Sequence, residues 1–96
     1  MCPTSNVATR AVERLEDHPV RALRDAGVVV TVNSDDPPMF GTTLNHEYEV
    51  AADLLDLDRD GLTELARTAA RSAFLPASDV AALVAEIDAY AADAPA

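Results

Sequence analysis

The sequence predicts an α/β fold, because one strongly apolar strand lies among segments with helical spacing. Residues 28–33 read VVVTVN, a near-continuous valine run typical of parallel strands that are covered on both faces. This strand must end before Pro37 and Pro38, since two consecutive prolines cannot remain in a hydrogen-bonded ladder. The segments on either side carry apolar residues every three or four positions, which is the period of an amphipathic helix.

We expect five helices around the strand. The expected helical segments are residues 7–16, 18–27, 44–55, 59–73 and 79–92. Pro19 suits the first turn of the second helix, and Gly27 suits the position just beyond its end. Asp79 is the expected N-cap of the last helix, because its carboxylate can accept from N–H groups of the first turn. The tail ADAPA is expected to fray.

A single strand raises a problem of assembly. A strand covered on both faces needs partners along both edges, and one strand cannot form a sheet. The only other candidate is the segment CPTSN at residues 2–6, which reads as a strand end or a loop. We therefore expect residues 1–96 to form part of a larger domain, without a second domain, or to complete a sheet by self-association.

The charge balance and composition exclude several classes of partner. The 96 residues carry a formal net charge of −10, and the seven basic residues are all arginines. They form no basic patch, so we expect no binding to nucleic acid. No apolar run approaches the ~18 residues of a membrane span. Cys2 is the single cysteine, which indicates no internal disulfide and a reducing, cytoplasmic location.

Asp35 and Asp36 directly follow the predicted strand, and they are the first candidates for chemistry. Parallel α/β proteins place their functional residues at the carboxyl ends of strands. Adjacent side chains there point in different directions, so one acid could reach a metal and the other a substrate. A turn is the alternative, because Ser-Asp-Asp-Pro is also a good Asx-turn sequence. A zinc site would need about three protein ligands, so this pair cannot form one alone.

Short motifs in a fixed order run along essentially the whole chain. They are Cys2-Pro3-Thr4-Ser5-Asn6, His18-Pro19, Asp25-Ala26-Gly27-Val28, Asn33-Ser34-Asp35-Asp36-Pro37, Phe40, Glu47-Tyr48 and the later ARSAFLP. This series resembles the C-terminal part of the zinc-dependent adenosine deaminase family. The resemblance implies a C-terminal fragment of a (β/α)8 barrel, in which residues 2–6 end the seventh strand and residues 28–33 form the eighth.

The resemblance also implies a role for each aspartate. Asp35 resembles the family's zinc ligand, a catalytic residue that also accepts a hydrogen bond from the water on the metal. Asp36 resembles the aspartate that contacts the purine ring of a small nucleoside substrate. In the family, zinc lowers the pKa of this water, hydroxide attacks the carbon that bears the amino group, and ammonia leaves an inosine-type product.

The remaining Zn²⁺ ligands of the family are absent from this chain. The family takes them from a His-x-His on the first strand and from histidines after strands five and six, and its proton-transferring glutamate also follows strand five. His18 and His46 have neither spacing; we interpret the first as a cap or packing residue and the second as solvated. We therefore expect the isolated chain to be inactive.

Other candidate sites have plainer interpretations. Residues 56–67, DLDRDGLTELAR, imitate a calcium loop, but Arg67 stands where the bidentate glutamate belongs, and Asp58 suits an N-cap. Cys2 precedes a proline and suits packing better than nucleophilic catalysis. Ser5 and Asn6 could line a site or hydrogen-bond within a turn. Residues 39–40, Met-Phe, could cover a substrate or anchor the loop, and the anchor is favoured.

Two further functions remain open at this point. Close relatives within the family act on adenine or on aminodeoxyfutalosine, an intermediate of menaquinone biosynthesis, and the residues that choose the substrate lie largely outside this chain. The second alternative is a non-enzymatic acidic helical module that binds a partner through the apolar faces of residues 44–55 and 80–90.

Overall fold

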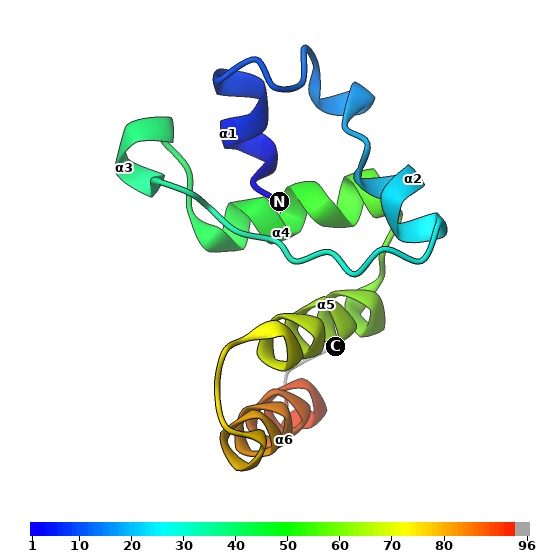
Figure 1. Ribbon diagram of the computed structural model, residues 1–96, viewed down its shortest axis with the longest axis vertical. Helices are drawn as coiled ribbons and strands as arrows, with labels where there is room; N and C mark the ends of the chain where they lie inside the picture. Colours follow the sequence, from blue (N-terminus) through cyan, green and yellow to red (C-terminus); the bar gives the residue numbers. More distant parts are fainter. Residues whose placement is uncertain (94–96) are drawn as a thin grey trace.

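The computed structural model describes residues 1–93, and helices account for all of its regular secondary structure. Two of the helices, α4 and α5, are long and lie near the centre of the molecule (Figure 1). The elements are α1 (Pro3–Ala8), the 3₁₀ helix η1 (Leu15–Asp17), α2 (Val20–Asp25), α3 (Pro37–Phe40), α4 (Leu44–Leu55), α5 (Arg59–Ser72) and α6 (Ala77–Asp93).

The elements form two groups that meet where α4 joins α5. Both α1 and α2 contact α4, and the irregular segment 26–36 crosses the same helix (Figure 1). The second group is the pair α5 and α6, which pack against each other through the largest contact between any two helices. Arg67 on α5 strengthens this pair, because its Nε donates to Asp88 on α6 at 2.6 Å. The candidate acids belong to the first group.

A small core lies between the two groups. It consists of Val20, Val32, Ala51, Leu55 and Leu65. Ala51 and Leu55 are one turn apart on α4, so they share the face that packs against the rest of the chain. Leu65 joins this cluster from α5. The helix predicted at residues 44–55 therefore forms with the predicted boundaries, and its apolar face is occupied within the chain.

The expected helix ends at Asp58 and Gly27 are confirmed, and Thr43 is a cap that was not predicted. Arg59–Ser72 matches the predicted helix 59–73, and the Asp58 side chain accepts from the Gly61 backbone N–H at 2.9 Å. Thr43 caps α4 in the same way through the His46 N–H. Gly27 follows α2 with φ of +89°, a conformation that suits glycine best.

The predicted strand at residues 28–33 is wrong for the chain as described, since residues 1–93 contain no strand. Two bonds of a parallel ladder are nevertheless present: the Met1 amino group donates to the Thr31 carbonyl at 2.6 Å, and Asn33 N–H donates to the Met1 carbonyl at 2.8 Å. Met1 thus bonds to the two neighbours of Val32, as residues in parallel strands do. One such bridge is too short to make a sheet, and Val29 remains 73% exposed.

The predictions for the N-terminal helix and for the Asp79 cap are also wrong. Pro3 begins α1 four residues before the expected start, and the helix ends at Ala8. Arg10 then adopts a left-handed conformation with φ of +63°, which stops the helix. Short helices need tertiary packing, and most side chains of residues 9–16 are exposed. Asp79 lies within the first turn of α6, because that helix already begins at Ala77.

Within residues 1–93 we find no helix that has both the length and the apolar character that crossing a membrane requires. The predicted frayed tail begins inside α6, which continues to Asp93, and its last three residues lie outside the described part of the chain.

Candidate active site

The two adjacent aspartates lie in a sharp turn, and their side chains have different partners. Asp35 has φ of +60°, a left-handed conformation that is uncommon outside glycine and that asparagine and aspartate tolerate best. Asp36 is extended and caps α3, because its Oδ1 accepts from the Met39 N–H at 3.2 Å. Pro37 occupies the first turn of α3, where its missing N–H is no loss. Gly41 ends this one-turn helix with φ of +63°. The turn interpretation therefore holds for Asp36.

Asp35 is held by a residue thirty positions away in the sequence. The buried Ser5 hydroxyl donates to Asp35 Oδ2 at 2.6 Å. Ser5 belongs to α1, so this bond joins the CPTSN segment to the aspartate pair. The Asp35 residue itself is exposed, which leaves its carboxylate accessible on the molecular surface. A strained backbone and a fixed, accessible carboxylate are features of functional sites.

Among the described side chains around Asp35, only its own carboxylate is placed to coordinate a zinc ion. Zinc accepts carboxylate oxygen, and a hydrogen bond from a neighbour commonly orients such a ligand. No group of three or more histidine, cysteine or acidic side chains gathers anywhere in residues 1–93 in a way that could hold a metal. These residues therefore cannot hold zinc by themselves.

His18 forms part of the scaffold beside this site. Its Nδ1 accepts from the Val20 N–H at 3.2 Å, and its Nε2 lies 2.9 Å from the Asn6 side-chain oxygen. Both contacts are satisfied when the imidazole is neutral with the proton on Nε2. The interpretation of His18 as a cap is thus confirmed, and Asn6 makes a local contact with it.

This arrangement predicts that acid destabilises the fold through His18. Burial, together with the positive charge of the N-terminus, lowers the pKa of His18 below its usual 6.5. The unfolded chain therefore binds this proton at higher pH than the folded chain, so stability decreases as pH falls through 6.5 toward the folded pKa. We expect His18→Gln to flatten the pH dependence of the melting temperature between pH 7 and 5. An unchanged slope would contradict the role of His18.

The other candidate residues take the plainer interpretations, with the exception of Met39. His46 is exposed on α4, and its nearest acid is Glu49 at 3.9 Å. Cys2 is half-buried at the start of α1. Met39 is 76% exposed and so does not anchor the loop within this chain, whereas Phe40 is half-buried. Asp58 is the N-cap of α5, as predicted, and residues 59–67 of the calcium-like segment lie within that helix.

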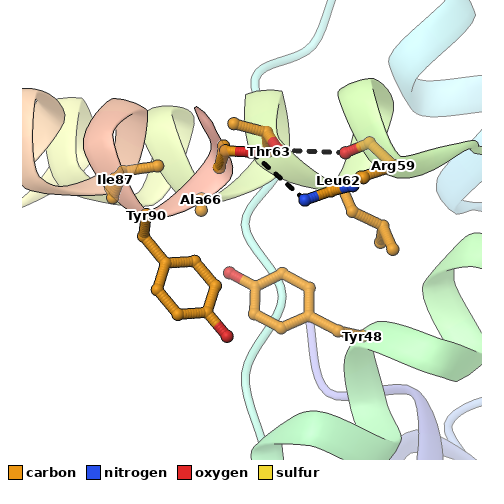
Figure 2. Close-up of a pocket in the computed structure, with 8 residues that line it drawn as sticks. Tyr48, Arg59, Leu62, Thr63, Ala66, Ile87 and Tyr90 are labelled. Carbon is orange, nitrogen blue, oxygen red and sulfur yellow. Dashed lines mark hydrogen bonds between the residues drawn. The ribbon is translucent and has the colours of Figure 1, made fainter. Parts of the chain in front are cut away.

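An apolar cavity lies away from the aspartate pair. It has a volume of about 280 Å³ and lies between α4, α5 and α6. Figure 2 shows Tyr48 and Tyr90 entering the same space from α4 and α6, with Leu62 and Ala66 from α5 beside them. None of its lining residues belongs to the candidate site, and they include no acid. We therefore do not assign this cavity to catalysis.

One residue near the site was given no role from sequence. Glu47 is fully buried, with 0% of its surface exposed. It accepts hydrogen bonds from the Thr4 backbone N–H at 3.1 Å and from the Thr42 hydroxyl at 2.7 Å. The available signal was its spacing: Glu47, Ala51 and Leu55 follow one another at four-residue intervals, which places an acid on the apolar face of α4.

The chain matches a known protein family over nearly its whole length. Residues 1–90 match the model of the adenosine deaminase family. The class of protein that this match defines is the deaminases. The chain belongs to the adenosine deaminase family.

Its relatives are deaminases with different substrates. The chain is 60% identical over 92 residues to an aminodeoxyfutalosine deaminase of Streptomyces avermitilis, covering 96% of this chain and 26% of that protein. It is 45% identical over 91 residues to an adenine deaminase of Sphingopyxis alaskensis, covering 95% and 27%. The crystal structure of an adenine deaminase from Arthrobacter aurescens superposes with a TM-score of 0.83 at 36% identity, covering 94% and 28%. The chain thus spans about a quarter of the length of these relatives.

Proposed function

We propose that this chain supplies one wall of a zinc-dependent site that hydrolyses the amino group of an adenine ring. Asp35 is the zinc ligand and catalytic carboxylate of this proposal, and Asp36 is the residue that contacts the purine. The main support for this proposal is the Ser5–Asp35 hydrogen bond, because it brings the motif of residues 2–6 to the carboxylate of the motif of residues 33–37.

Each aspartate has the chemistry for its role. The Ser5 hydroxyl occupies Asp35 Oδ2 and restrains the carboxylate, while the aspartate keeps further lone pairs for a metal. Bound zinc would supply a water of lowered pKa as the nucleophile. Asp36 uses Oδ1 to cap α3 and retains capacity at its other oxygen to accept a hydrogen bond from the exocyclic amino group, the only N–H of an adenine nucleoside's ring system. The products are ammonia and the corresponding 6-oxopurine.

The rest of the site comes from residues outside this chain. In this proposal the chain is the C-terminal part of a (β/α)8 barrel, and the missing portion contributes the histidine ligands and the proton-transferring glutamate. Two observations support it: Met1 already forms a parallel bridge beside Val32, and Val28 and Val29 are exposed where further strands would cover them. Binding of a partner through α4 is disfavoured, because the apolar face of α4 is buried within the chain, whereas Leu83 and Tyr90 on α6 remain exposed.

The substrate is an adenine-containing small molecule, with adenosine as the reference member. Relatives named for aminodeoxyfutalosine and for adenine share 60% and 45% identity with this chain, so similar sequences belong to deaminases whose substrates differ beyond the ring. Both substrates present the same exocyclic amino group. We therefore propose that Asp35 and Asp36 act on the adenine ring that these substrates share. The rest of the substrate is then recognised by the part of the barrel outside this chain.

A chimera tests this function. The segment of the Streptomyces avermitilis aminodeoxyfutalosine deaminase that matches this chain is replaced by residues 1–96, and ammonia release is measured with aminodeoxyfutalosine, adenosine and adenine. We expect zinc-dependent deamination of at least one of the three. A folded chimera that binds zinc but releases no ammonia from any of them would falsify the proposal.

A further inference from the structure

Glu47 is buried at the point where three segments of the site scaffold meet. Its Oε2 accepts from Thr4 N–H on α1, and its Oε1 accepts from the Thr42 hydroxyl at 2.7 Å, in the connection between α3 and α4. An acid with no exposed surface is costly to bury, and such groups persist when they are hydrogen-bonded. Both carboxylate oxygens of Glu47 have a partner.

The two partners of Glu47 are adjacent to the two halves of the aspartate site. Thr4 immediately precedes Ser5, whose hydroxyl holds Asp35. Thr42 follows the one-turn helix that Asp36 caps, and its N–H donates to the Pro37 carbonyl at 3.1 Å. The Glu47 carboxylate therefore connects the segment that orients Asp35 to the loop that contains Asp35 and Asp36.

We propose that Glu47 is a positioning residue for deamination, an inference that rests on the function proposed above. It holds α1 at the distance at which Ser5 reaches Asp35, and it holds the end of the aspartate loop through Thr42. Glu47 does not contact the reacting groups, and its effect on them passes through Ser5 and Thr42.

A purely structural role of Glu47 predicts a different pattern of effects. Loss of a buried hydrogen-bonding group would then lower stability, while the folded fraction would keep its metal affinity and turnover. Glutamine separates the two roles. Its oxygen can accept from Thr4 N–H, and its amide can donate to Thr42 Oγ1, whose proton is free to turn to the Thr43 carbonyl 3.3 Å away. Methionine keeps the volume but accepts neither bond well.

The experiment compares four variants of the chimera. Glu47→Met removes the bonds to Thr4 and Thr42. Glu47→Gln can keep both bonds, with the direction of the bond to Thr42 reversed. Thr42→Val removes only the bond to Thr42 and keeps the shape of the side chain. Leu65→Ala is the matched control, because it creates a cavity in the core away from the aspartates. For each variant we measure kcat, KM, zinc affinity by competition with a chelator, melting temperature, and hydrogen exchange of residues 1–8 and 33–42.

We expect Glu47→Met to lower kcat and zinc affinity by up to about 10-fold, less than the roughly 10- to 100-fold cost of losing a direct outer-shell partner of a metal ligand, because Ser5 remains in place. Hydrogen exchange should increase in residues 1–8 and 33–42. Glu47→Gln should restore kcat to within a few-fold of the parent, and Thr42→Val should give a smaller loss. Leu65→Ala should lower the melting temperature without changing zinc affinity. Adding Glu47→Met to Ser5→Ala should cost much less than Glu47→Met alone, because both act on Asp35.

Parent-like kcat and zinc affinity in folded Glu47→Met would overturn the positioning role, as would fully additive effects with Ser5→Ala. If Glu47→Met does not fold, Glu47→Gln and Thr42→Val decide the question through zinc affinity and local exchange. Failure of the proposed function has a separate signature: the parent chimera then releases no ammonia, whereas the zinc affinity and exchange of the Glu47 variants still report on the positioning of Asp35.

Discussion

Asp35→Ala in the chimera is expected to reduce kcat/KM by more than about 100-fold and to remove the bound zinc. Loss of an outer-shell partner already costs about 10- to 100-fold, and Asp35 is proposed to be a direct ligand. Alanine also leaves the buried Ser5 hydroxyl without its acceptor. Ammonia release and the zinc content of the dialysed protein measure the two effects.

Two variants control this experiment. Asp35→Asn keeps the shape and can still accept from Ser5, but it removes the negative charge, so zinc loss in this variant points to the charge rather than to misfolding. Asp53→Ala removes an exposed acid from α4 and should leave activity and metal content unchanged. An Asp35→Ala chimera with full activity and bound zinc would rule out the assignment of the ligand.

The isolated 96-residue chain is expected to show no deamination and no tight zinc binding. One oriented carboxylate cannot provide the roughly three protein ligands of a catalytic zinc site, and residues 1–93 hold no other group of suitable side chains. Joining the chain to the rest of the relative should therefore raise activity from background to a measurable rate. Ammonia release from adenosine and zinc titration of the purified chain measure this difference.

Deamination by the isolated chain that disappears in Asp35→Ala would contradict this expectation. It would mean that the chain completes a site by self-association. Size-exclusion chromatography of the active species, with and without zinc, would then establish the number of copies that contribute to it.

Local sequence predicted the long helices well because their signals are short-range. Residues 44–55 and 59–72 have caps at their starts and an apolar face that finds partners within the chain. The strand at residues 28–33 and the helix at residues 7–16 were wrong for the opposite reason. A strand is defined by its neighbours, and here a single residue, Met1, bridges to it.

The aspartate pair and its family could be predicted from the order of motifs along the chain. The partners of the pair could not, because hydrogen bonds between residues thirty or more positions apart leave no periodic signal. Ser5 was one of two possible site residues until the fold placed its hydroxyl on Asp35. From sequence alone, Glu47 had a place in a motif but no role. Its complete burial and its two hydrogen bonds are visible only in the structure.

The sequence by itself determined the family, since the motifs that define it stand in a fixed order along the chain and the family model matches residues 1–90. Only the tertiary structure decided how the two aspartates are held. Asp36 is used by its own loop as a helix cap, whereas Asp35 is oriented by α1, which is tied in turn to α4 through Glu47. The physical reason is that a carboxylate acquires direction from the donors around it, and folding brings those donors together.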